Sequence, residues 1–176
     1  MALIVEDGTN VSGADASSSV ADCSAWAVLY YGSALVGSPA DKESAIRRAV
    51  AYLDGLKWKG TRTHGRDQSL AWPRDGVTDC EGLAIASDEI PDELIFAQHT
   101  LARVEFLSPG ALSPSVSLSG VVKREKVDVI EVEYDTARMQ GNAQEMRPII
   151  TMAMDKIACL LTVQPGGRRI PDAVVV

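Results

Sequence analysis

The sequence reads PDELIFAQHTLARVEFL from Pro91 to Leu107. Apolar residues occur at positions 94, 97, 101 and 104, and again at 95, 102 and 106, a spacing typical of a helix with apolar cover on most sides. Pro91 suits the first helical turn because its missing N–H needs no partner there, and nearby acids lie at the positive end of the helix dipole. The pattern predicts a buried central helix that the rest of the chain covers.

A first helix is predicted upstream of this segment. Ser19 and Asp22 have the spacing of a capping box, which opens a helix from Val20 to Tyr31, and Gly32 ends it. The residues predicted to form its buried face are Trp26, Leu29 and Tyr30. A short edge strand is predicted before it, at Leu3 to Val5.

A second helix follows with clear boundaries. Ser38 is a suitable N-cap, Pro39 occupies the first helical position, and Gly55 ends the helix. One continuous apolar stripe predicts its buried face, namely Ala45, Ile46, Ala49, Val50 and Leu53.

Residues 56–86 show no helical or strand periodicity, so they predict a long loop of the kind that is functional, disordered or ordered by a partner. Its tryptophans argue against disorder. Residues 57–74 contain five basic residues and one acidic residue. Residues 79–105 contain seven acidic residues and one arginine. Such a separation of charge suits contact between neighbouring copies of the chain, and it equally suits two solvated surfaces.

A β-hairpin is predicted from Val121 to Asp135, after a Ser-, Pro- and Gly-rich connector at 108–120. With the turn at residues 128–129, Lys126 lies opposite Glu131 and Arg124 lies opposite Glu133. These pairs are cross-strand ion pairs of opposite sign. A two-stranded ribbon is marginally stable alone, so it is expected to pack on something, for example a neighbouring subunit.

A last helix is predicted from Arg147–Pro148 to Leu161. Residues 1–161 are therefore interpreted as one domain, and residues 162–176 as an extended C-terminal tail whose apolar end either docks on a partner or frays.

The length and amino-acid composition favour a soluble globular protein. The chain has 176 residues, 46% hydrophobic and 23% charged, with a formal net charge of −7. No apolar run approaches the length of a membrane span, and the N-terminus lacks the features of a signal peptide, so a cytoplasmic origin is expected. The acidic balance argues against a protein that grips phosphates over its whole surface.

No familiar catalytic or metal-binding motif is present in the sequence. Cys23, Cys80 and Cys159 lack metal-ligand spacing and are interpreted as reduced thiols or small core residues. His99, within the central helix, is expected to be a hydrogen-bonded core residue. The acids around Asp92 are explained by the helix dipole without a metal. We therefore expect no enzyme, metal or cofactor.

A single-stranded nucleic-acid site is the alternative, because it requires aromatic residues interleaved with basic ones. Lys57-Trp58-Lys59 and Trp72-Pro73-Arg74 offer a little of that pattern. The simpler interpretation is that both tryptophans anchor the loop against the core, and the low aromatic content, 5%, favours it.

Four segments carry a resemblance to a known family: Ala2–Thr9 (ALIVEDGT), Leu70–Val77 (LAWPRDGV), Ile90-Pro91, and Val122–Tyr134. They resemble a tailed-phage family catalogued as DnaT-like single-stranded DNA-binding proteins, which is similar in size and layout to phage head–tail connector (adaptor, or head-completion) proteins. The resemblance covers residues 2–161, and Leu-Ala-Trp-Pro-Arg is its most specific part. Residues 17–19 depart from it, being serines where relatives usually have an aromatic residue.

The resemblance implies a small bundle of about four helices with a protruding hairpin, assembled as a dodecameric ring beneath the capsid portal. Its partners would be other copies of the chain, the portal, the next neck or tail protein, and genome DNA sliding through an acidic passage that repels it. The location would be the virion neck, after synthesis in the host cytoplasm. The residues proposed for contacts with subunits or partners are Trp58, Arg62, Arg66, Trp72, Arg74, Lys123, Arg124, Lys126, Glu131, Glu133, Arg168 and Arg169.

Overall fold

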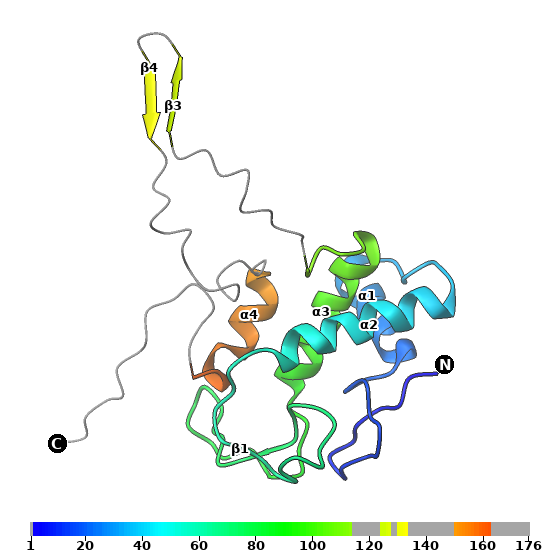
Figure 1. Ribbon diagram of the computed structural model, residues 1–176. Helices are drawn as coiled ribbons and strands as arrows, with labels where there is room; N and C mark the ends of the chain where they lie inside the picture. Colours follow the sequence, from blue (N-terminus) through cyan, green and yellow to red (C-terminus); the bar gives the residue numbers. More distant parts are fainter. Residues whose placement is uncertain (1, 114–123, 128–129, 134–149, 163–176) are drawn as a thin grey trace, which may run out of the picture.

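The computed structural model describes residues 2–113, 124–127, 130–133 and 150–162. Within these ranges the chain forms four α-helices, a short 3-10 helix and two two-stranded antiparallel sheets, which confirms the predicted class. The elements are α1 (Val20–Tyr31), α2 (Pro39–Asp54), β1 (Thr61–Arg62), β2 (Arg74–Asp75), α3 (Asp92–Leu107), β3 (Arg124–Val127), β4 (Ile130–Glu133), α4 (Thr151–Ile157) and η3 (Ala158–Leu160) (Figure 1).

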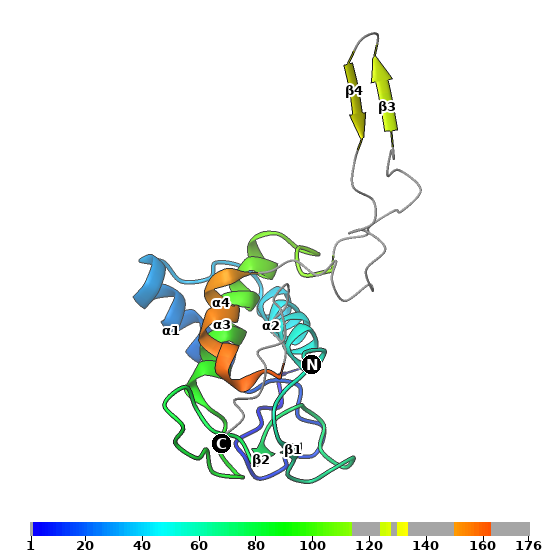
Figure 2. The same cartoon turned by 90° about the vertical axis from the view of Figure 1, so that its left-hand side faces the viewer.

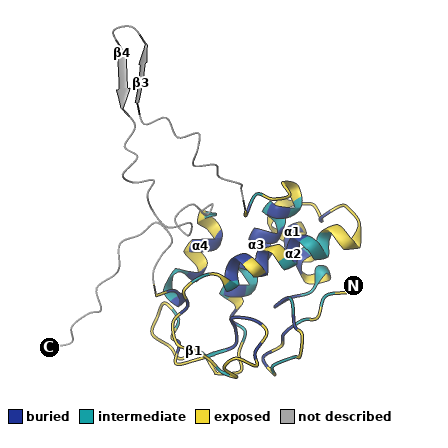
Figure 3. Ribbon diagram, in the orientation of Figure 1, coloured by how far each residue is buried: buried dark blue, intermediate teal, exposed yellow. Residues whose placement is uncertain are grey.

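The helix α3 is the centre of the bundle, as predicted. It contacts α1, α2 and α4, and Figure 2 shows α3 and α4 between α1 and α2. Its Leu94, Ala97 and Leu101 side chains are buried, and Figure 3 shows the buried residues concentrated where α2 meets α3. Pro91 is the N-cap rather than the first helical residue, because its backbone is extended (φ −67°, ψ 144°) while its carbonyl accepts the Leu94 N–H.

The predicted second helix is confirmed at both ends. The Ser38 hydroxyl accepts a hydrogen bond from the Asp41 N–H at 3.1 Å, Pro39 is the first helical residue, and Gly55 is the C-cap. The whole predicted stripe is buried, together with Tyr52. Helix α2 thus presents its apolar side to α3, as its sequence pattern indicates.

The first helix has the predicted ends but a different buried face. Ser19 and Asp22 form the capping box, and Gly32 is the C-cap in the left-handed region (φ 71°). Trp26 is buried as predicted, but the prediction for Leu29 and Tyr30 is wrong, because both are exposed. The buried residues of α1 are Cys23, Trp26 and Ala27, and the helix contacts both α2 and α3.

The predicted N-terminal strand is wrong, because only Val5 forms a bridge, with Ala16. The chain turns instead around the buried Glu6 carboxylate. It accepts hydrogen bonds from the N–H groups of Gly8, Asn10 and Val11 at 2.9, 2.9 and 3.0 Å. The hydrogen bonds to the Glu6 side chain therefore shape this segment, in place of the strand pairing that was predicted.

The hairpin register is confirmed. In the antiparallel pair β3–β4, Arg124 is the partner of Glu133, Lys126 of Glu131, and Val127 of Ile130. Among the described elements, each of these strands contacts only the other. The predicted connector beyond residue 113 and the turn at residues 128–129 lie outside the described residues.

The last helix begins later than predicted. Ile150 has extended backbone (ψ 91°) as the N-cap, so α4 starts at Thr151, and the chain tightens into η3 before Leu161. Ala153, Ile157, Leu160 and Leu161 are buried. Residues 147–149 and the tail from residue 163 lie outside the described ranges.

Candidate interaction surfaces

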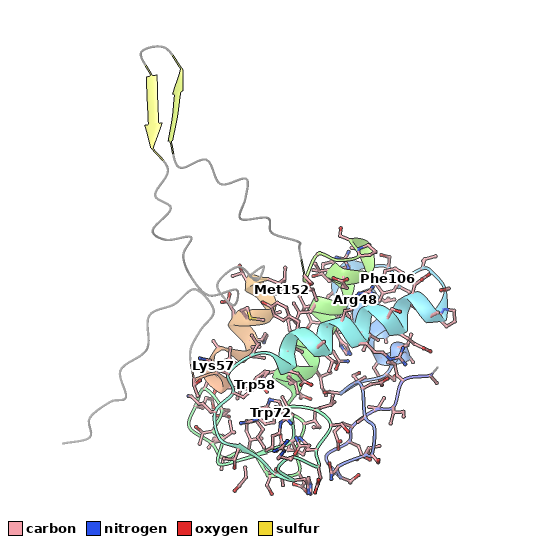
Figure 4. All side chains as sticks on the ribbon, viewed as in Figure 1. Arg48, Lys57, Trp58, Trp72, Phe106 and Met152 are labelled. Atoms are coloured by element: carbon pink, nitrogen blue, oxygen red, sulfur yellow. A yellow bond between two sulfur atoms is a disulfide. The ribbon has the colours of Figure 1, made fainter. Side chains whose placement is uncertain are left out.

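The tryptophan loop (residues 56–86) is anchored from within by its two indole rings. Trp72 is 1% exposed and Trp58 is buried beside it, with ring centroids 5.7 Å apart in a T-shaped arrangement. Trp58 Nε1 donates a hydrogen bond to the Leu53 carbonyl of α2 at 3.0 Å, and Figure 4 shows both rings beneath that helix. This confirms the interpretation that the tryptophans hold the loop to the core.

Polar side chains satisfy the backbone of this loop. The buried Gln68 amide donates to the carbonyls of Leu70 and Pro73 at 2.9 and 3.0 Å. The Asp54 carboxylate accepts the Ala71 N–H at 2.8 Å, and burial raises the pKa of Asp54 above its usual value. Because buried backbone groups need hydrogen-bond partners, these contacts explain how irregular backbone is tolerated in the buried part of the loop around residues 70–73.

Arg74 is a structural residue of the loop. Its guanidinium donates hydrogen bonds to the carbonyls of Lys59, Gly60 and Ala71 at 2.7, 2.7 and 3.0 Å. Burial lowers the pKa of Arg74. Its donors are therefore directed into its own chain, alongside the short β1–β2 pairing in which Arg62 is its partner.

The loop is also fastened to the end of α4. Backbone hydrogen bonds of 2.9 Å run from the Lys59 N–H to the Leu160 carbonyl and from the Thr162 N–H to the Lys57 carbonyl. Cys80 and Cys159 form a disulfide, so the prediction of reduced thiols is wrong for this pair. The two cysteines are 79 residues apart in sequence, and only the docking of the loop on η3 brings them together.

Cys23 agrees with its interpretation as a small core residue. It is free and fully buried, and that burial raises the pKa of its thiol to about 12. A thiol with so high a pKa stays protonated at neutral pH, which makes it a poor nucleophile.

A tight turn next to the disulfide, the Leu83 turn (residues 78–84), presents one apolar side chain to solvent. The Asp79 carboxylate accepts hydrogen bonds from the N–H groups of Glu81 and Leu83, each at 2.8 Å. A bridge between Thr78 and Ala84 closes the turn. Leu83 is 64% exposed at its tip.

The last turn of α1 forms an exposed apolar surface, which we call the α1 face. Its residues are Val28, Leu29, Tyr30 and Tyr31. Leu29 is 79% exposed, and Val36 in the following loop is 88% exposed. No charged residue occurs between Asp22 and Asp41, so this part of the surface is uncharged in its own sequence.

Two cations from other helices border the α1 face. The Arg103 guanidinium of α3 lies 3.6 Å from the Tyr31 ring centroid, and the Lys156 ammonium of α4 lies 5.3 Å from that of Phe96. Phe96 in turn packs edge-on against Tyr30, with centroids 5.3 Å apart. Tyr30, Tyr31 and Phe96 thus form an aromatic cluster with a basic border, to which three helices contribute.

His99 lies beneath this region and is a core residue, as expected. Its Nε2 is 2.9 Å from the Ser18 hydroxyl, and both side chains are buried. Burial lowers the pKa of His99 to about 4, so the ring is neutral at pH 7. The Asp22 carboxylate is bonded to the Ser19 hydroxyl at 2.6 Å instead of orienting the imidazole, and within the described residues His99 Nδ1 has no partner. The arrangement therefore differs from a nucleophilic triad.

A buried carboxylate that sequence reasoning missed holds the chain beyond α3. Glu105 accepts hydrogen bonds from the Gly110 and Leu112 N–H groups at 2.6 and 3.0 Å, and Arg48 pairs with it at 2.6 Å. Burial raises the pKa of Glu105, but these backbone donors and Arg48 outweigh it and leave the pKa lowered. The position of Glu105 in an apolar helix pattern carries no local signal of this role.

The proposed contact residues are distributed over different parts of the chain. Trp58 and Trp72 lie in the interior, Arg74 is half-buried, and Arg62 and Arg66 are exposed on the loop. The hairpin register relates Arg124 to Glu133 and Lys126 to Glu131. Three others lie outside the described residues, namely Lys123, Arg168 and Arg169.

Neither a membrane span nor a metal cluster is found in the described part of the chain. No helix there is long and apolar enough to cross a bilayer. No group of three or more His, Cys, Asp or Glu side chains gathers there as a metal ion requires.

The chain belongs to a known family. The family model described as "Putative DnaT-like ssDNA binding protein" matches residues 1–171, which is nearly the whole sequence. No curated protein and no solved structure matches the chain.

Proposed function

We propose that this protein is a structural subunit of the tailed-phage virion, which forms a ring-shaped head–tail adaptor beneath the portal. The ring would pass genome DNA through its centre and offer a platform to the next neck or tail protein. The proposal rests on the layout of the chain, a four-helix bundle with a β-hairpin. It also rests on the resemblance of its motifs to a tailed-phage family that is similar in size and layout to connector proteins.

The main support for a role in protein assembly is the exposed α1 face. Four consecutive exposed apolar residues close α1 on a chain whose net charge is −7. Exposed apolar patches with polar or charged borders are typical of protein–protein contacts. A subunit that binds neighbours in a ring needs such a surface, whereas a protein that works alone does not.

The charge and the tryptophans support a conduit more than a DNA grip. Trp58 and Trp72 are buried, so their rings are closed to stacking by nucleobases. An acidic wall repels a phosphate backbone and lets it slide, while a basic wall holds it through released counterions.

The test is the protein content of virion necks. Virions of the phage that encodes this chain are dissociated, neck fragments are isolated, and their composition is measured by mass spectrometry and electron microscopy. We expect the chain in stoichiometric amounts at the head–tail junction. Its absence from those fragments would overturn the proposal.

Single-stranded DNA binding is a second candidate, favoured by the family description and by one feature of the surface. The exposed Tyr30 and Tyr31 rings, with Arg103 against Tyr31, combine stacking surfaces and positive charge. This function predicts salt-sensitive binding of a labelled oligonucleotide, weakened by Tyr30→Ala and by Arg103→Ala. Absence of binding at low salt and micromolar protein excludes it.

A further inference from the structure

We propose that the α1 face of one copy binds the Leu83 turn of a second copy. The inference rests on the proposed ring and deepens it by naming the two surfaces that meet between neighbours. Its first support is that both surfaces expose large apolar side chains, Leu29 at 79% and Leu83 at 64%.

The two surfaces have opposite charge. Arg103 and Lys156 border the α1 face through their contacts with Tyr31 and Phe96. The chain from Thr78 to Glu89, which includes the Leu83 turn, carries four acids and no basic residue. Complementary charge around apolar contacts steers association and disfavours wrong partners. The acid-bordered leucine of one copy thus fits the base-bordered aromatic face of another.

The Leu83 turn is pre-ordered for such a contact. The Asp79 carboxylate accepts hydrogen bonds from two N–H groups of the turn, and the disulfide from Cys80 to Cys159 ties the turn to η3. Ordering a turn before binding reduces the entropy that association costs. An exposed leucine on a turn held in this way is therefore a good anchor.

The two surfaces lie on different parts of the molecule. In Figure 1 the loop that leads into α3 is at the lower left, whereas α1 is at the upper right. Because the proposed contact joins unlike patches, it is heterologous. Repeating it adds copies in one direction and gives a ring where the rotation between copies closes, or an open filament where it does not. The inference therefore supplies a means of assembly that a self-complementary patch would not.

The test is zero-length cross-linking. The full chain, prepared as a mixture of ¹⁵N-labelled and unlabelled protein, is treated at high concentration with a carbodiimide that couples amines to carboxylates. We expect mixed-isotope peptides that link Lys156 to Glu81, Asp88 or Glu89. Leu29→Asp and Leu83→Asp should each reduce this link by about tenfold or more, whereas Leu107→Asp, on a similarly exposed leucine, should leave it intact.

Mixing the two variants sharpens the test. Leu29→Asp keeps a normal Leu83 turn, and Leu83→Asp keeps a normal α1 face, so their mixture retains one good interface per pair. Sedimentation velocity should show dimers in the mixture, monomers for either variant alone, and larger species for the wild type. Circular dichroism of both variants should match the wild type, since both side chains are exposed.

Two outcomes overturn the inference. They are a wild type without the intermolecular link, and a link that survives Leu83→Asp. The neck composition tests the ring itself independently of these results. A chain found in necks but insensitive to both substitutions would refute this interface and leave the proposed function standing.

Discussion

The tryptophan loop and the last turn of α1 both place aromatic residues beside basic ones, but the structure uses them in opposite ways. The side chains of Trp58 and Trp72 are buried, and the Arg74 guanidinium donates its hydrogen bonds to carbonyls of the loop itself. Tyr30 and Tyr31 are outside, with Arg103 against an exposed ring. The comparison teaches that aromatic and basic residues in sequence do not by themselves indicate a binding surface.

The largest expected effect comes from removing the anchor of the loop. Trp72→Ala should lower the free energy of unfolding by about 3–5 kcal/mol, because it leaves a cavity where a fully buried ring packed. Tyr30→Ala is the matched change on α1 and should cost about 1 kcal/mol, mainly through its contacts with Trp26 and Phe96. Urea denaturation measures both, and equal costs would break the comparison.

The second-largest effect on stability is expected from removing the disulfide between Cys80 and Cys159. Cys80→Ser should lower the free energy of unfolding under oxidising conditions by about 2–4 kcal/mol, because the bond closes a long loop of the unfolded chain. Cys159→Ser removes the same bond and should cost the same. The double variant should then cost no more than either single change, and additive costs would show that the cysteines act separately.

The pH dependence of stability tests the packing under α1. In the unfolded chain the pKa of His99 is about 6.5, whereas burial lowers the pKa of His99 to about 4 in the folded protein. The unfolded state therefore binds more protons in this window, and stability should fall as pH drops through it, by up to about 3 kcal/mol. His99→Gln should remove this part of the pH dependence, which denaturation at several pH values measures.

The smallest effect is expected on the α1 face. Leu29→Ala should change the free energy of unfolding by no more than about 0.5 kcal/mol, because the side chain is mostly exposed. Leu94→Ala is the control on α3, where a buried leucine should cost about 2–5 kcal/mol. A large cost at Leu29 in thermal or urea unfolding of the monomer would mean that α1 packs more tightly than its exposure indicates.

Local pattern determined much of the fold. Caps at Ser19 and Ser38 and glycines at 32 and 55 set the ends of α1 and α2, since these signals act within a few residues. The hairpin register also follows from local alternation and turn position. Short-range hydrogen bonding and side-chain periodicity are readable from sequence because they depend on neighbours along the chain.

The candidate surfaces were only partly predictable. The separation of charge between residues 57–74 and residues 79–105 is visible in the sequence, but it suits contact between copies and two solvated surfaces equally, and it does not name the contact residues. The α1 face was mispredicted because Leu29 and Tyr30 have helical spacing relative to Trp26, and periodicity does not tell how wide a face the neighbouring helix covers. Exposure of that face depends on how α1 crosses α3.

By itself, then, the sequence determined which segments are helical, where α1 and α2 begin and end, and that α3 is buried, because these follow from residues close together in the chain. Only the tertiary structure decided that Cys80 meets Cys159, that Glu105 holds Gly110 and Leu112 while paired with Arg48, and that the tyrosines of α1 point outward. Each of these depends on groups brought together by packing, and no local pattern records such distances.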